Sequence, residues 1–153
     1  MTVLNWDLVW RRVSRRPEFQ GRSQDQFRFS ALGKQFTLTT GQQLAAQPLD
    51  FPDQAIVLGV GAGVSVSAAA TAEIRGLNCL RVGMDYSGSS GSIITGGRMN
   101  AAALFGNYGQ RQFPAREIII PRGNTLNIGV DNLSTSTVLF DLVFHSMIYA
   151  PNN

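Results

Sequence analysis

The chain has 153 residues and a formal net charge of +3 at pH 7, and only 15% of its residues are charged. This length normally makes one domain that buries roughly two thirds of its unfolded surface. The single cysteine, Cys79, excludes an intrachain disulfide, and no apolar run approaches the ~20 residues of a bilayer-spanning helix. We therefore expect a protein made in a reducing cytoplasm, with no membrane segment.

Positive charge is concentrated near the N-terminus. Residues 1–34 hold seven cationic and three acidic residues, a net charge of +4, whereas residues 35–153 hold six cationic and seven acidic residues, a net charge of −1. We therefore divide the chain into a basic arm, 1–34, and a body, 35–153. A basic arm predicts an acidic partner, and nucleic acid, an anionic lipid surface and another protein are all open at this point.

The arm begins with a predicted amphipathic helix over residues 5–16. Asn5 is a plausible N-cap, and Pro17 ends the run. One face carries four apolar side chains at positions i, i+3, i+4 and i+7: Trp6, Val9, Trp10 and Val13. A helix of about three turns is not stable alone in water, so it needs a surface on which to dock.

After the helix, residues 18–30 are polar and predict an extended linker, and short apolar runs separated by turn residues then predict antiparallel strands. The predicted strands are residues 34–40, 55–60, 78–85, 93–95, 118–120, 125–131 and 137–149. Residues 41–54 are a predicted loop, residues 100–109 are predicted to be a loop or a single turn, and residues 65–73 fit either a helix or a strand. Strands this short, with turns every ~8–12 residues, indicate an all-β sandwich or barrel. Residues 137–149 are apolar at odd and even positions alike, so that both faces of the strand are apolar, which predicts a central strand.

The most enzyme-like motif is an apolar run into the alternating glycines Gly59, Gly61 and Gly63, followed by alanines and a second strand that ends at Asp85. This order imitates a dinucleotide-binding unit, in which glycines let backbone amides approach a pyrophosphate. However, the third glycine comes one place early, and no further alternation of strands and helices follows. We interpret the glycines as parts of a β-turn or bulge.

Other catalytic or metal-binding patterns are weak. His145 is the only histidine and lies mid-strand, which favours a packed side chain over a catalyst or metal ligand. The acidic residues are scattered singly, and residues 86–91 lack the Gly-Lys-Ser/Thr ending of a phosphate-binding loop. We expect no catalytic residue, no metal site and no cofactor.

The arm carries the one functional signal above background. Arginine favours bidentate pairing with carboxylate or phosphate, and the tryptophan face favours docking into an apolar groove on a neighbouring subunit. The predicted partner-binding residues are Trp6, Trp10, Arg11, Arg12, Arg15, Arg16, Arg22 and Arg28. The alternative is a helix that packs on its own β body with a solvated basic face.

The C-terminal part of the chain contains, in this order, an aromatic-Pro pair, an apolar strand, a Pro-x-Gly turn, a strand, Asn-Leu and a final apolar strand. This order is carried by Ala103-Leu-Phe-Gly106, Arg111-Gln-Phe-Pro114, Ile118-Ile-Ile-Pro-Arg-Gly-Asn-Thr-Leu126, Val130-Asp-Asn-Leu133 and the last strand. Over roughly residues 54–150 this order resembles the small β-sandwich proteins of tailed-bacteriophage virions, in particular capsid cement or decoration proteins. The resemblance implies an antiparallel, jelly-roll-like β-sandwich, self-association and attachment to a viral shell.

The expected function is therefore that of a non-enzymatic virion protein, made in the host cytoplasm, which binds the major capsid protein or another virion protein. An alternative is a carbohydrate- or receptor-binding module of a tail or fibre, with exposed aromatic residues in the 86–91 and 105–113 loops. Nucleic-acid binding is less favoured because it depends on the arm alone, and a nicotinamide-dependent enzyme is the most distant alternative.

Overall fold

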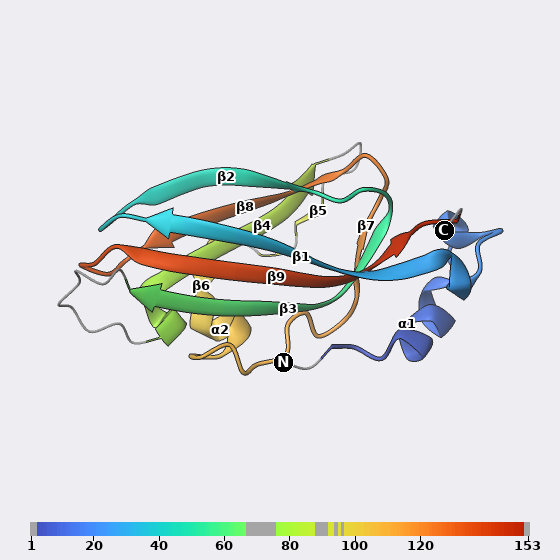
Figure 1. The fold of residues 1–153 in the computed structure, drawn as a ribbon, viewed down its shortest axis with the longest axis horizontal. Helices are drawn as coiled ribbons and strands as arrows, with labels where there is room; N and C mark the ends of the chain where they lie inside the picture. The colour runs from blue at the N-terminus through green and yellow to red at the C-terminus, as the bar shows by residue number, and fades with distance from the viewer. Residues whose placement is uncertain (1–2, 67–75, 88–91, 94, 96, 152–153) are drawn as a thin grey trace.

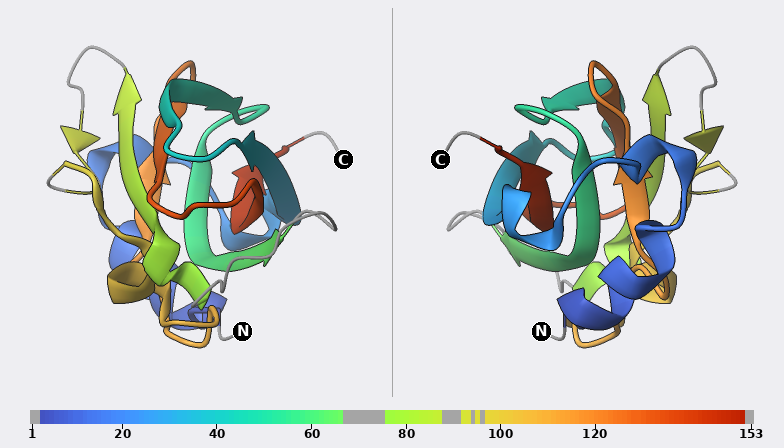
Figure 2. Two further views of the ribbon diagram at one scale, coloured as in Figure 1. Left: turned by 90° about the vertical axis from the view of Figure 1, so that its left-hand side faces the viewer. Right: turned by 90° about the vertical axis from the view of Figure 1, so that its right-hand side faces the viewer.

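The computed structural model describes residues 3–66, 76–87, 92–93, 95 and 97–151, and it consists of two antiparallel β-sheets packed face to face (Figures 1 and 2). Sheet I has the order β1-β9-β3-β7, formed by Phe27–Leu38, Val138–Tyr149, Ala55–Val66 and Ile118–Ile120. Sheet II has the order β2-β8-β4-β5, formed by Gln43–Asp50, Thr125–Asn132, Leu80–Ser87 and Ser92–Ile93, and the short β6 (Met99–Asn100) also pairs with β4. Except for β4, β5 and β6, which all belong to sheet II, successive strands alternate between the two sheets as in a jelly roll, so the predicted fold class is confirmed.

The last strand is central, as its sequence predicts. β9 pairs along its whole length with β1, from Phe27 opposite Tyr149 to Leu38 opposite Val138, and on its other edge with β3. Every second side chain of β9 points between the sheets, and from Val138 to Phe144 these side chains are at most 1% exposed. They pack against inward-facing side chains of sheet II such as Val82, Ile128 and Val130.

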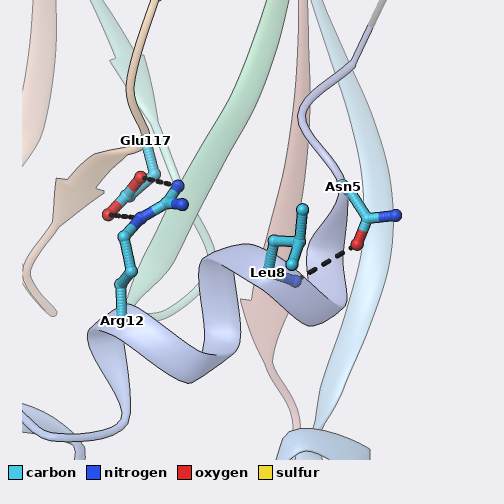
Figure 3. Close-up of polar contacts among 4 residues, drawn as sticks. All are labelled: Asn5, Leu8, Arg12 and Glu117. Carbon is cyan, nitrogen blue, oxygen red and sulfur yellow. Dashed lines mark hydrogen bonds and ion pairs between the residues drawn. The ribbon is translucent and has the colours of Figure 1, made fainter.

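The N-terminal helix is also present, and it docks on the chain's own body. α1 spans Trp6–Val13, and Asn5 caps it by accepting a hydrogen bond from the backbone N–H of Leu8 at 3.1 Å (Figure 3). The helix and the turn after it cover one end of the outer face of sheet I, away from the main core (Figure 1). A second cluster of buried side chains forms there: Val9, Val13, Phe19, Phe27, Ile56, Leu58 and Met147.

The predicted linker over residues 18–30 is wrong in part. Two 3-10 turns, Pro17–Phe19 and Gln24–Gln26, follow the helix, and β1 begins at Phe27 and crosses residue 34, where we placed the end of the arm. The polar residues that suggested a linker occupy solvent-facing positions of these turns, while Phe19 and Phe27 are buried beneath the helix.

The predicted loop over residues 41–54 is also wrong, because residues 43–50 form β2. β2 lies at the edge of sheet II and pairs only with β8, so Pro48 removes no bond from an interior ladder. Its alanines and glutamines give no strong strand signal. Residues 100–109 contain the short helix α2, Ala101–Phe105, and β3 extends through Val66, so most of the ambiguous 65–73 segment lies outside the described residues. No helix in the described part of the chain is long and apolar enough to cross a bilayer.

The cluster under α1 predicts that replacing two different phenylalanines by alanine lowers the free energy of unfolding by very different amounts. Phe19 is 1% exposed, whereas Phe29 is 58% exposed on β1. Phe19→Ala should lower the free energy of unfolding by about 3–5 kcal/mol, because it leaves a cavity beneath the helix. Phe29→Ala should lower it by about 1 kcal/mol or less. Urea unfolding of both variants checks this, and equal losses would mean that α1 does not stabilise the sandwich.

Candidate interaction surfaces

The two predicted partner-binding tryptophans pack against the chain's own β-sheet. Trp6 and Trp10 are half-buried, with ring centroids 5.6 and 5.4 Å from that of Phe27, and Trp10 also lies 6.0 Å from Phe19 in an edge-on arrangement. The apolar groove that these side chains occupy is therefore on the chain itself, which is the alternative that the sequence left open. A direct role for them in partner binding stays a prediction.

Arg12 fastens the other side of the helix. Its Nη2 donates to Oε2 of Glu117 at 2.7 Å and its Nε to Oε1 at 3.4 Å (Figure 3). Glu117 directly precedes β7, and its side chain is only 2% exposed. Burial by itself would raise the pKa of this carboxyl, but the hydrogen bonds from Arg12 and the backbone outweigh it, and the pKa is lowered. The pair thus connects α1 to the edge of sheet I.

Two further arginines of the predicted set are also engaged within the chain. The guanidinium of Arg22 lies 4.0 Å from the ring centroid of Tyr149, and it donates a hydrogen bond to the side-chain oxygen of Gln54. Arg28 donates from Nη1 to the backbone carbonyl of Asp25 at 3.2 Å. Both contacts hold the segment between α1 and β1 against the body, so these arginines have a structural role.

The remaining three arginines lie at the C-terminal end of α1 or directly after it, and the helix also carries an exposed leucine. The side chains of Arg11, Arg15 and Arg16 are exposed and make no ion pair or hydrogen bond with any described residue. Leu8 is 54% exposed, Arg11 follows it at i+3 on the same side of the helix, and Arg15 and Arg16 come directly after the C-cap residue Ser14. We call Leu8, Arg11, Arg15 and Arg16 the α1 surface.

The alternating glycines form no phosphate-binding turn. Gly59, Gly61 and Gly63 lie inside β3, which continues antiparallel to β9 through Val66. A dinucleotide unit needs its strand to end before the glycines. The register shifts between Val57 and Gly59, so the interpretation of a β-bulge is confirmed at the first glycine.

His145 faces outward from β9, opposite Gly59, and its ring centroid lies 5.8 Å from that of Phe29. Partial burial lowers the pKa of its imidazole, which favours the neutral form. Among the described residues, no group of three or more His, Cys, Asp and Glu side chains could hold a metal ion. His145 is thus a packed side chain on the face of sheet I.

The outer face of sheet II carries a hollow of about 330 Å³ that the sequence did not predict. Arg98 lies across Gly83 and Gly129, which are paired neighbours on β4 and β8. Its guanidinium pairs with the carboxylate of Asp131 and donates to the carbonyl of Leu44 at 2.8 Å. A Cβ on Gly129 would lie 2.7 Å from Nη2 of Arg98, so glycine makes room for the arginine. Glycines at mid-strand were the only available sequence signal.

A second, more open hollow of about 790 Å³ lies between α2, the 3-10 turn Gly76–Cys79 and the loop over residues 106–113. The polar residues in the described part of its lining are Asn78, Asn100, Asn107, Gln110 and Arg111. We call it the amide hollow. Tyr108, between two of these residues in the chain, is 78% exposed. The sequence predicted exposed aromatic residues in this loop, and the structure exposes Tyr108 but packs the half-buried Phe113 edge-on against the fully buried Phe105, at 5.3 Å.

No protein-family model, curated protein or solved structure matches the chain. A functional proposal therefore depends on the surfaces described above.

The Arg12–Glu117 pair predicts an acid-sensitive contribution to stability. Because the pKa of Glu117 in the folded protein lies below its ordinary value of 4.5, the pair stabilises the fold above that value, and this contribution is lost as the pH falls through the lowered pKa. Glu117→Gln should therefore destabilise the protein near neutral pH and much less in strong acid. Urea unfolding across this range checks the expectation, with the exposed Glu18→Gln as control. A Glu117→Gln penalty independent of pH would contradict it.

The loop beside the amide hollow predicts that two glycine-to-alanine substitutions differ in their effect on stability. Gly109 has φ +73°, and a Cβ there would lie 2.3 Å from the carbonyl oxygen of Ala62, whereas Gly63 has open space around it and an ordinary φ. Gly109→Ala should lower the free energy of unfolding by more than about 1 kcal/mol, since both strain and a backbone clash are introduced. Gly63→Ala should stay within about 0.5 kcal/mol of the parent. Thermal unfolding distinguishes them, and similar midpoints would mean that the loop does not pack on β3.

Proposed function

We propose that the chain is a non-enzymatic structural virion protein that binds and stabilises a bacteriophage capsid through protein–protein contacts. The sequence resemblance to cement proteins suggests this role, and the jelly-roll sandwich is compatible with it. The observation that carries the proposal is the α1 surface, in which a firmly held helix exposes Leu8 and Arg11 and is followed directly by the exposed Arg15 and Arg16. The partner would be the major capsid protein or another virion protein.

The composition of the α1 surface favours a protein partner. Interfaces between proteins combine a desolvated apolar centre with a polar rim, and arginine is enriched in them. Leu8 supplies the centre and Arg11, Arg15 and Arg16 the rim. A nucleic-acid site would use the arginines but would leave the exposed leucine without a role. We therefore expect an acidic patch with an apolar depression on the partner.

The firm attachment of α1 adds to this argument. Asn5 caps the helix, Arg12 ties it to Glu117, and Val9 and Val13 on its inner face are fully buried. Binding by a surface that is already ordered loses little conformational entropy. On a shell, many copies present this contact at high effective concentration, so that a weak single contact is sufficient. Self-association of the chain, which the resemblance implies, would increase the effect.

The α1 surface predicts a loss of binding without a loss of folding. Arg11→Glu together with Arg15→Glu should reduce co-sedimentation with head particles of a tailed phage that encodes the chain by about tenfold or more, because two favourable charge contacts become repulsive. Leu8→Ala should weaken binding as well. Deleting residues 1–28 would be a poorer test, since it would also expose Ile56 and Leu58.

The control is Arg122→Glu, the same charge change at an exposed arginine between β7 and β8. It should bind like the parent. Unchanged binding of the α1 variants would refute the assignment of the surface, and absence of the chain from such particles would refute the virion role. Light scattering with the 260/280 nm absorbance ratio tests the nucleic-acid alternative, which requires co-eluting nucleic acid that high salt removes.

A second candidate function is a carbohydrate- or receptor-binding module of a tail or fibre. It is favoured by Tyr108, which is 78% exposed and lies in the chain between Asn107 and Gln110, two residues that line the amide hollow. Amides that hydrogen-bond hydroxyl groups, next to an aromatic ring that is apolar on its face, suit a sugar. Retention of any glycan on an array would support this function.

A further inference from the structure

The amide hollow is dominated by hydrogen-bond donors. The side-chain oxygen of Asn100 accepts from the N–H groups of Ala102 and Ala103 at 2.9 and 3.3 Å. That of Asn107 accepts from Nδ2 of Asn78 at 3.0 Å, and that of Gln110 accepts from the N–H of Tyr108 at 2.8 Å. Three of the four amide oxygens in the lining are therefore already occupied within the protein, and only that of Asn78 has no such bond among the described residues.

The unused groups are mostly N–H donors. The side-chain nitrogens of Asn107 and Gln110 make no hydrogen bond with a described residue. Arg111 uses Nη1 to bind the carbonyl of Ala103 at 2.7 Å, which leaves further guanidinium N–H groups available. No Asp or Glu lies among the described residues that line the hollow. The arginine and amide donors of this described lining, with no carboxylate among them, are complementary to an anionic oxygen acceptor.

The donors are held in fixed positions. Asn107 accepts a hydrogen bond at its backbone carbonyl from Leu77 at 2.7 Å, and the N–H of Arg111 donates to the carbonyl of Phe105 at 2.7 Å. Gly76, close against Asn107, leaves no room for a Cβ, since one would lie 2.2 Å from the carbonyl oxygen of Asn107. A surface loop fixed on several sides loses little entropy when it binds a ligand.

The rigid loop presents Tyr108 beside these donors. Tyr108 lies directly after Asn107 and two residues before Gln110, and its own N–H is held by the Gln110 side chain. Fixed at this place, the exposed ring offers an apolar face on which the C–H groups of a pyranose can stack. A ligand that satisfies both features has a sugar ring for Tyr108 and a carboxylate for the donors.

We propose that the amide hollow binds a carboxylate-bearing saccharide, with the carboxylate held by Asn107, Gln110 and Arg111 and a sugar ring stacked on Tyr108. This inference rests on the second candidate function above and names its site and ligand class. It is independent of the α1 surface, which shares no residue with the hollow.

The test uses a galacturonic acid trisaccharide and the neutral galactose trisaccharide of the same linkage as probes, with calorimetry or NMR titration of the full chain. The acidic probe should bind, and the neutral one about tenfold more weakly or worse, because charge-assisted hydrogen bonds are lost. Asn107→Asp is the sharpest variant: the new carboxylate can still accept from Asn78, but it removes a donor and repels the probe. It should weaken acidic binding by about tenfold or more, and Tyr108→Ala should weaken both probes.

The matched control is Asn124→Asp, the same change on the turn between β7 and β8. It should bind like the parent. Equal binding of acidic and neutral probes, lost in Tyr108→Ala, would overturn the carboxylate specificity while the glycan-binding function stands. Binding that Asn107→Asp and Tyr108→Ala leave unchanged would overturn the site, and an additional loss on charge reversal at Arg11 and Arg15 would move the site to α1. No binding to either probe or to any glycan would overturn both proposals.

Discussion

The pairing of β9 with β1 on one edge and β3 on the other is the constraint on which the rest of the structure depends. β9 contributes apolar side chains to both faces of sheet I: Phe140 and Phe144 fill the space between the sheets, whereas Met147 lies under α1 on the outer face. A strand that is buried on both faces near one end provides a dry platform for a helix that is too short to be stable alone. The position of the α1 surface is therefore set by the last strand of the chain.

Sequence periodicity predicted the elements whose apolar side chains recur at regular intervals. β9 and α1 were found because their buried positions are apolar apart from Ser146, and the sandwich class follows from short strands separated by turn residues. The beginning of β1 was missed because Arg28 and Ser30 interrupt its apolar residues within a largely polar stretch. β2 was missed because it is an edge strand in which Gln, Ala, Pro and Asp outnumber the two leucines. Edge strands bury little side-chain surface, so their sequences show only a weak alternation of apolar and polar residues.

The candidate surfaces were less predictable, because their contacts join segments that are remote in the chain. The eight predicted arm residues could not be sorted by local pattern: Arg12 is neutralised by Glu117, 105 residues away, and Arg22 packs on Tyr149. Only the folded chain shows that Arg11, Arg15 and Arg16 are left exposed. Likewise, the amide hollow brings together residues 78, 100 and 107–111, whose polar side chains look like ordinary loop composition in the sequence.

β3 supports the segments that carry both the α1 surface and the amide hollow, and the bulge near Gly59 helps to explain how. Before the bulge, β7 covers the edge of β3 over only three residue pairs, and Ile56 and Leu58 face α1. Beyond it, the same edge would be left open, but the N–H of Val60 donates to the carbonyl of Phe113 at 2.7 Å, and Gly109 packs against the carbonyl of Ala62. The 106–113 loop thus protects an exposed strand edge, which is a structural need in any β-protein. That need fixes the loop backbone, and a fixed backbone allows Tyr108 to remain ordered while it is exposed. Protection of the strand edge does not itself require an aromatic ring that faces solvent. The ring of Tyr108 is therefore the part of the loop that a function has to explain.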